Sequence, residues 1–517
     1  MENDMSRIPE THEQLDPIDV RSILSQGLKE NPNSMALASL DREYTWAELE
    51  HFSDCLARYY IDSGFKPGEI IATLSRNTPE LFMHYLACFR AGLISVTLKH
   101  IYSLEDIQTC LRYVDISSIV IAQDVDDATR QYFFDNEVIR KIPYQTLIDD
   151  AVEHHSGRSP DDAIDYPTVD PQDPCIIHFS SGSTGSPKGI THSYNSLGHM
   201  MSSVAEGYGI NEHDTLLPAV HFSAFFTTLA TLYRKGRALV LDDFADHKIL
   251  TLLRRYRATI LGIAPTGYQN LIRHADTRPE DFQSVRLALT GGYQSPAALL
   301  HEFRQKTNSI LLDSYGLTEC GISHSRRSGS ENVTGSVGPV MPGFQCAIRN
   351  EDGEVPTGET GEMWIKSPSN AIGYWNNPVA QKHAFNGEWI RTGDLMYGDG
   401  EGNYYFVGRV NHIIEMPNGE KLLPETVEVL LRQHEEVDQA VVTGSQHADK
   451  SVTLNVFITR ARKADISDQK LIRDCQTLLQ PYDAEKQILI HDTFPRTATG
   501  KIDRVRIQTE SATKKPL

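Results

Sequence analysis

The segment FSSGSTGSPKG, residues 179–189, combines residue types that could bind a polyphosphate. Its glycines permit close backbone approach, its hydroxyls can donate hydrogen bonds to phosphate oxygens, and Lys188 adds a positive charge. The GxxxxGK[ST] spacing of a Walker A loop is absent. A flexible Ser/Gly linker is the simpler alternative, but linkers seldom follow an apolar run such as Cys175–Ile177 directly. We therefore predict a phosphate-binding loop that follows this apolar run and precedes a helix at residues 194–206.

Four further segments C-terminal to this loop combine glycine with charged, hydroxyl or aromatic residues: YGLTE at 315–319, RTGDL at 391–395, GR at 408–409 and PRTATGKIDR at 495–504. Taken alone, most of these have plainer explanations. YGLTE could be a turn into a helix, Asp394 could cap a helix from a surface turn, and Lys501 could be a solvated charge. Their occurrence together and in this order makes those explanations weaker.

The five segments resemble the ordered motifs of the adenylate-forming superfamily, which contains acyl- and aryl-CoA synthetases, peptide-synthetase adenylation domains and firefly luciferase. The resemblance spans residues 179–504, and the family's usual length covers nearly the whole chain. It implies an ATP- and Mg²⁺-dependent acid–thiol ligase, most like a stand-alone acyl- or aryl-CoA ligase. Such an enzyme joins a carboxylic acid to the α-phosphate of ATP, releases pyrophosphate, and transfers the acyl group from the acyl-adenylate to coenzyme A. Because two anions must meet, its site needs cations and hydrogen-bond donors.

The resemblance also implies roles for single residues. The Tyr315 ring would lie against the adenine, and Asp394 would accept from the two ribose hydroxyls with help from Arg409. The implied catalytic residues are Lys501, Thr318, Glu319 and His221, and the implied metal ligands are Glu319 and Thr184. The implied ATP-binding residues are Ser180, Ser181, Gly182, Ser183, Thr184, Gly185, Lys188, Gly291, Gly292, Tyr293, Asp313, Ser314, Tyr315, Gly316, Thr318, Asp394, Arg409 and Lys501.

The segment LPAVHFSAFF, residues 217–226, bears on the acid substrate. By resemblance, adenylation domains for α-amino acids carry Phe-Asp here, whereas this chain has Val220 and His221, so an α-amino acid is disfavoured. Core packing is the alternative for His221. Apolar and aromatic walls suit an aryl or a short-to-medium aliphatic acid, and the bulk of Tyr293 would shorten the pocket. The implied acid-pocket residues are His221, Phe222, Phe225, Phe226, Gly316, Gly321 and Ile322.

The sequence departs from the family pattern around the implied hinge and near the last motif. Asn411 stands where Asp or Lys is usual, Glu415 replaces a common lysine, Asn418 replaces the first of two glycines, and Asp483 follows Tyr482. These changes leave open a second acceptor, the phosphopantetheine of an acyl or peptidyl carrier protein. A non-catalytic nucleotide-binding protein and a luciferase-like oxygenase are further alternatives. The intact motif residues argue against the former, and no feature demands the latter.

The elements that must position these residues alternate between strand and helix patterns. Strand patterns at Ile70–Leu74 and Ile119–Ala122 alternate with helical spacing at Glu80–Ala91 and His247–Tyr256, which predicts an α/β fold with parallel-rich sheets. Short strands and turn residues dominate after residue 335, and a new α/β pattern begins near residue 410. We predict a flexible tail (1–17), a large N-terminal adenylation domain (18–409) with a β-rich subdomain (about 335–409), a small mobile α+β C-terminal domain (410–508) and a second tail (509–517).

Composition excludes several classes of protein. The 517 residues include 69 acidic and 49 basic side chains, a formal charge of −20, which disfavours nucleic acid or an anionic membrane as partner. No apolar stretch of about 18 residues or signal-peptide pattern is visible. The seven cysteines are never arranged as CxxC, unlike a disulfide framework or zinc site. We expect a cytoplasmic protein with reduced thiols, and a homodimer is left open.

Overall fold

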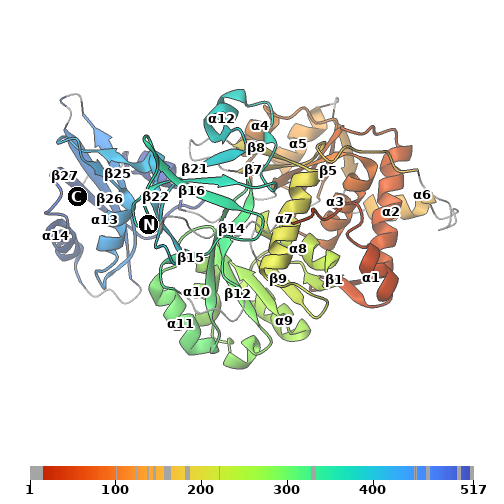
Figure 1. The fold of residues 1–517 in the computed structure, drawn as a ribbon, viewed down its shortest axis with the longest axis horizontal. Helices are drawn as coiled ribbons and strands as arrows, with labels where there is room; N and C mark the ends of the chain where they lie inside the picture. The colour runs from red at the N-terminus through yellow and green to blue at the C-terminus, as the bar shows by residue number, and fades with distance from the viewer. Residues whose placement is uncertain are drawn as a thin grey trace, which may run out of the picture.

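A computed structural model places three large β-sheets, their helices and a smaller C-terminal group of elements along the long axis of the molecule (Figure 1). It describes residues 15–99, 102–122, 125–136, 139–143, 147–155, 165–180, 187–219, 222–327, 333–447, 449, 451–461, 466–497 and 502–512. Within these residues, no helix combines the length and the apolar character that crossing a bilayer requires.

The first sheet has seven strands in the order β19-β8-β7-β4-β3-β5-β6. Five of them, β7 to β6 in that order, are parallel, and β8 and β19 join one edge in antiparallel fashion. All six residues of β3 are buried, as expected for a parallel strand covered on both faces. The strands are β3 (Ile70–Ser75), β4 (Ile94–Lys99), β5 (Ser118–Ile121), β6 (Arg140–Pro143), β7 (Pro174–Ser180), β8 (Lys188–Ser193) and β19 (Gly373–Tyr374).

The second sheet has eight strands in the order β14-β13-β12-β11-β9-β10-β1-β2. Its six central strands are parallel, and β14 and β2 close the two edges in antiparallel fashion. The strands are β1 (Met35–Ala38), β2 (Glu43–Thr45), β9 (Thr215–Ala219), β10 (Arg237–Leu239), β11 (Ile260–Ile263), β12 (Leu287–Gly291), β13 (Leu311–Leu317) and β14 (Gly321–Ser325). YGLTE therefore lies at the end of a strand and in the turn that follows it, not in a turn into a helix.

Two buried helices join these sheets. α7 (Tyr194–Gly207) and α8 (Phe222–Tyr233) lie between them in Figure 1, and both contribute to one apolar core with residues of β7, β9 and β12. The remaining helices of this part are α1 (Ser25–Glu30), α2 (Trp46–Asp62), α3 (Pro79–Ala91), α4 (Leu104–Leu111), α5 (Asp127–Asp135), α6 (Leu147–His155), α9 (Asp246–Tyr256), α10 (Pro265–Arg273), the short helix η1 (Pro279–Phe282), α11 (Ala297–Thr307) and α12 (Pro378–Ala384). The predicted strand–helix alternation and α/β class are confirmed.

The third sheet is antiparallel, with the order β15-β22-β21-β18-β16-β17, and β20 pairs with β21. Its burial alternates along β18 and β21, the pattern of a sheet with one covered face. The strands are β15 (Ser336–Gly338), β16 (Gln345–Asn350), β17 (Gly353–Glu354), β18 (Gly361–Lys366), β20 (Phe385–Asn386), β21 (Trp389–Gly398) and β22 (Tyr404–Arg409).

The C-terminal elements have a core of their own, separate from the core between the large sheets. Helix α13 packs against strand β25 and also reaches the end of β22, where the Glu425 carboxylate lies against Gly408. The boundaries predicted at residues 17, 335, 409 and 508 stay predictions. The elements are the short helix η2 (Val410–His412), β23 (Ile414–Glu415), β24 (Lys421–Leu422), α13 (Pro424–Leu431), β25 (Val437–Gln446), β26 (Val452–Arg460), α14 (Asp468–Leu478), β27 (Glu485–His491) and α15 (Arg504–Ala512).

Candidate active site

The Asp394 carboxylate is held by groups from two other strands. Asp394 on β21 stands opposite Arg409 on β22, and the Arg409 Nε lies 2.5 Å from Asp394 Oδ1. The Tyr315 hydroxyl, at the end of β13, donates to Asp394 Oδ2 at 2.7 Å. The Asp394 side chain is 4% exposed and that of Arg409 29%. Three residues predicted to bind the nucleoside therefore meet in one hydrogen-bonded group.

Charge and burial keep both Arg409 and Tyr315 protonated. Burial is the largest single influence and would lower the pKa of Arg409, but the charge and hydrogen bond of Asp394, together with the nearby Tyr315 and Glu319, outweigh it and the pKa is raised. Burial, followed by the nearby Asp394 carboxylate, raises the pKa of Tyr315 well above its usual value. Tyr315 therefore keeps its proton and donates, and Arg409 stays charged. A carboxylate has about four acceptor positions, so Asp394 retains capacity to accept from further hydroxyls.

Glu319 lies in the turn between β13 and β14, half-buried beside β19 and β8. Its Oε1 accepts a hydrogen bond from the Tyr374 hydroxyl at 2.8 Å, and its backbone carbonyl accepts from the Ala371 N–H at 2.7 Å. The Lys188 Nζ lies 5.1 Å from the centre of the Tyr374 ring, a cation–π arrangement. The structure thus brings Glu319 and Lys188, predicted from separate motifs, into contact with one tyrosine, Glu319 at its hydroxyl and Lys188 at its ring.

A buried histidine orders the residue before Glu319. The His192 Nε2, on β8, lies 2.8 Å from the Thr318 carbonyl, which can only accept, so this nitrogen carries the proton. Burial lowers the pKa of His192 to about 4, so the ring is neutral near pH 7. The sequence patterns did not single out His192, Tyr374 or Ala371. These residues support the turn through contacts 52 to 126 positions apart in sequence, which no local pattern reveals.

The ends of β12 and β13 carry Gly291, Ser314 and Gly316, which are predicted to bind ATP. A Cβ at Gly291 would lie 2.7 Å from the Ser314 carbonyl oxygen, and one at Gly316 would lie 2.1 Å from the Gly321 carbonyl oxygen. Only glycine fits at either place without displacing backbone. The Ser314 hydroxyl donates to the Thr290 carbonyl at 2.8 Å. Parallel strands commonly bind ligands outside these carboxyl ends.

Asp313 is a buried carboxyl in the same group of residues. Its Oδ1 accepts from the Ser295 hydroxyl at 2.5 Å. Burial raises the pKa of Asp313 to about 6, and the Ser295 hydrogen bonds only partly oppose that rise. Tyr293 is fixed nearby, because its hydroxyl accepts from the Thr266 N–H at 2.8 Å and donates to the Thr266 hydroxyl oxygen at 2.9 Å.

The residues predicted to line the acid pocket occupy different environments. Phe225 and Phe226 lie in the core between the sheets, where Phe225 packs edge-on against Tyr85 with ring centres 4.7 Å apart. Gly321 has a φ of +83° and Ile322 is half-buried. Their roles toward an acid stay predictions.

Several predicted residues fall outside the described part of the chain: Ser181, Gly182, Ser183, Thr184, Gly185, His221 and Lys501, together with the side chain of Phe222. The two ends of the predicted phosphate loop are described, and Ser180 pairs directly with Lys188 across β7 and β8. Asn411, the predicted hinge residue, lies exposed in η2 directly after Arg409.

The site's chemistry fits one divalent cation held mainly by phosphates. Among the described residues, no group of three or more His, Cys, Asp or Glu side chains could enclose a metal ion. Mg²⁺ commonly binds through one or two carboxylates plus substrate phosphates and keeps several waters. The single half-buried carboxylate of Glu319, fixed by Tyr374, suits that mode. The residues therefore fit Mg²⁺ bound together with ATP.

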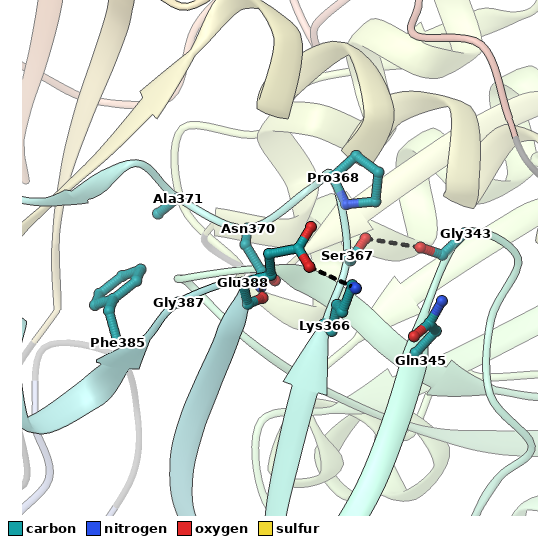
Figure 2. A pocket seen from close by; sticks show the side chains of 10 residues that line it. All are labelled: Gly343, Gln345, Lys366, Ser367, Pro368, Asn370, Ala371, Phe385, Gly387 and Glu388. Carbon is teal, nitrogen blue, oxygen red and sulfur yellow. Dashed lines mark hydrogen bonds and ion pairs between the residues drawn. The ribbon is translucent and has the colours of Figure 1, made fainter.

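A separate cavity of about 400 Å³ borders the elements that support this site (Figure 2). It lies at the ends of β16 and β18, with Lys366 paired to Glu388 at 2.6 Å. It is connected to the site through two of its lining residues: Ala371, which holds the Glu319 carbonyl, and Phe385, whose ring packs against Tyr374. None of the site residues predicted from the sequence is among those that line it.

Two family models and several curated proteins match the chain. Residues 24–375 match the AMP-binding enzyme family, and residues 426–501 match the AMP-binding enzyme C-terminal domain. The chain is 25% identical to a long-chain-fatty-acid–CoA ligase of Bacillus subtilis, over 95% of this chain and 94% of that protein. It is 28% identical to a 2-succinylbenzoate–CoA ligase of Bacillus velezensis, over 94% and 96%.

A solved structure extends the likeness to three dimensions. The anthranilate CoA ligase AuaEII, in complex with anthranoyl-AMP, superposes with a TM-score of 0.82 at 25% identity, covering 97% of this chain and 98% of that one. The resemblance to adenylate-forming enzymes that the sequence motifs indicated is confirmed. The chain belongs to the AMP-binding enzyme family.

Proposed function

We propose that this protein is an ATP-dependent acid–thiol ligase, which activates a carboxylic acid as acyl-adenylate with release of pyrophosphate and then forms a thioester with coenzyme A. The observation that carries the proposal is the meeting of Asp394, Arg409 and Tyr315 beside the Glu319 turn at the carboxyl ends of β12 and β13. The chain's relatives, named as CoA ligases acting on fatty and aromatic acids, support coenzyme A as the acceptor.

Each supporting group has a distinct task in the first step. Asp394, fixed by two donors, would accept from the ribose hydroxyls and set the position of the nucleotide. Lys188, with the loop hydroxyls including Thr184, would attract the phosphates. Bound Mg²⁺, held by Glu319, would supply positive charge that offsets the charge of the phosphates. Lys501 and Thr318 would stabilise the negative charge that accumulates where the acid meets the α-phosphate.

The acid is proposed to be aryl or short-to-medium aliphatic. The replacement of the Phe-Asp pattern by Val220 and His221 removes the carboxylate that would pair with a substrate ammonium. The Tyr293 side chain, held at its hydroxyl by Thr266, cannot swing aside without losing two hydrogen bonds. A fixed wall of this kind would favour shorter acids.

Acid-dependent ATP–pyrophosphate exchange at fixed Mg²⁺ would test the first step. The panel should contain aryl acids, aliphatic acids of graded length and α-amino acids. Exchange with one aryl or short-to-medium aliphatic class and none with amino acids is expected. If calorimetry shows ATP binding but no acid of the panel supports exchange, the chain would instead be a non-catalytic nucleotide-binding protein.

A carrier protein is the second candidate acceptor. Asn411, Glu415 and Asn418 depart from the family pattern and are all exposed, so the surface around the predicted hinge differs from that of a typical CoA synthetase. Thioester formation should be measured with coenzyme A and with phosphopantetheinylated carrier proteins side by side. Product with a carrier protein only would overturn coenzyme A as acceptor.

The proposal includes a cytoplasmic location, which the acidic composition and the cysteine pattern support. A homodimer stays an open prediction, and light scattering of the purified full chain would decide it. Luciferase-like oxygenation would be recognised by acid-dependent oxygen uptake or light emission, neither of which the proposed reaction produces.

A further inference from the structure

Strand β19 connects two parts of the candidate site that lie far apart in sequence. It pairs with β8, where Tyr374 stands opposite Ile190, and the Trp375 N–H donates to the Gly189 carbonyl at 2.7 Å. Just before β19, the Ala371 N–H donates to the Glu319 carbonyl. The segment from Ala371 to Trp375 therefore lies between the predicted metal ligand and the strand that begins with Lys188.

The Tyr374 side chain is buried and held by contacts at its ring, its hydroxyl and its backbone. It is 8% exposed, and its ring packs edge-on against Phe385 with centres 5.3 Å apart. Its backbone N–H donates to the Gln381 side chain at 2.8 Å. Gly373 has a φ of +153°, which favours glycine, and a Cβ there would also push against that same Gln381 oxygen at 2.5 Å. A side chain held in this way presents its hydroxyl in one direction.

The Tyr374 hydroxyl is the donor in its contact with Glu319, because an ionised carboxylate can only accept a hydrogen bond. It donates to Glu319 Oε1 at 2.8 Å, so the other carboxylate oxygen, Oε2, can serve as the ligand of a cation. A ligand that is already oriented loses less side-chain freedom on binding than a mobile one.

We propose that Tyr374 is a positioning residue that orients the Glu319 carboxylate toward Mg²⁺·ATP and, through its ring, holds the Lys188 ammonium on the same nucleotide. This inference rests on the proposed function, because it needs Glu319 to bind the metal. In this role Tyr374 would contact neither ATP nor the acid. Its effect should therefore appear in metal and nucleotide affinity before it appears in the affinity for acid.

The matched test compares Tyr374→Phe with Tyr60→Phe. The Tyr60 hydroxyl is also buried and hydrogen-bonded, to His84 at 2.7 Å, but it lies in the packing of α2 against α3. Binding of Mn²⁺ together with a non-hydrolysable ATP analogue is followed by electron paramagnetic resonance on the full chain, and Tm is measured in parallel. Tyr374→Phe should weaken Mn²⁺ binding roughly tenfold, the usual effect of losing a residue that orients a metal ligand. Tyr60→Phe should lower Tm only.

Glu319→Gln separates the failure of this inference from the failure of the function on which it rests. Unchanged Mn²⁺ binding in Glu319→Gln would remove Glu319 as a metal ligand and with it the basis for the proposal. If Glu319→Gln weakens binding but Tyr374→Phe does not, Tyr374 is a structural residue and the inference is wrong. The double variant Tyr374→Phe/Glu319→Gln should bind Mn²⁺ no more weakly than Glu319→Gln alone, because Tyr374 acts on the metal through Glu319.

Discussion

Replacing Asp394 by asparagine should weaken ATP binding by a factor that the structure allows one to estimate. Asp394 accepts from Arg409 and Tyr315 and is proposed to accept from both ribose hydroxyls. Hydrogen bonds to a charged group contribute about 1.5–3 kcal/mol and neutral ones about 1 kcal/mol. Exchanging a carboxylate for an amide should therefore cost about 2 kcal/mol of binding free energy, which is roughly a thirtyfold rise in Kd.

A second ion pair in the same protein provides an unusually close control. Asp214 pairs with Arg286 at 2.6 Å, and the two side chains are 2% and 30% exposed, against 4% and 29% for Asp394 and Arg409. Asp214 lies just before β9, at the opposite end of the sheet from the candidate site. Both Asp→Asn variants should lose similar thermal stability, because each removes the negative charge that pairs with a partly exposed arginine.

Only Asp394→Asn should lose ATP affinity when the two variants are compared by calorimetry on the full chain. The wild-type protein should also discriminate ATP from 2′-deoxy-ATP, and Asp394→Asn should discriminate less. Equal ATP affinities in the two variants would refute the assignment of Asp394 to the ribose, since both have lost the same kind of ion pair.

Three further predictions concern the rate, the pH dependence and the packing of the site. Lys501→Ala should bind ATP normally but lose adenylate formation by roughly a hundredfold or more in pyrophosphate exchange, and unchanged turnover would refute its role. The pKa of Asp313 is raised in the folded protein to about 6, so its ionisation destabilises the fold as pH rises from about 4 to 6, by up to about 2–3 kcal/mol. Asp313→Asn should remove this loss. The unfolding free energy of the variant, relative to that of the wild-type protein, should therefore increase from about pH 4 to pH 6. A difference that stays constant over this pH range would contradict the raised pKa of Asp313. Gly316→Ala would place a Cβ 2.1 Å from the Gly321 carbonyl oxygen, so we expect a loss of at least about 1 kcal/mol in thermal unfolding together with loss of exchange activity.

Local patterns predicted the elements of this protein well because those patterns depend on neighbouring residues. The apolar run at residues 70–74 forms β3, and the helical spacing at 80–91 forms α3 (Pro79–Ala91). The motif residues were likewise visible in the sequence, since each motif is a continuous segment. The structure then brought Tyr315, Asp394 and Arg409 together from separate strands.

The contacts that support the site could not be predicted in the same way. Tyr374 reaches Glu319 across 55 positions and His192 reaches Thr318 across 126, and neither residue stands out by type or spacing. Which partner a buried hydroxyl or imidazole finds depends on how sheets and helices pack, so the answer exists only in three dimensions. The same holds for Tyr293, whose bulk was apparent from sequence but whose anchor on Thr266 was not.

The position of Arg409 has a thermodynamic consequence for communication along the chain. Arg409 is the last residue of β22, and its side chain pairs with Asp394. The next residues, Val410 to His412, lead into the C-terminal elements. One of those elements, α13, places the Glu425 carboxylate against Gly408, the residue before Arg409. Any reorientation of those elements that disturbs Arg409 would change the affinity for nucleotide by some factor. Because such coupling is reciprocal, nucleotide binding must bias the orientation by the same factor. The Arg409 guanidinium would thus both support nucleotide binding and couple the presence of the nucleotide to the orientation of the C-terminal elements, which precede Lys501 in the chain.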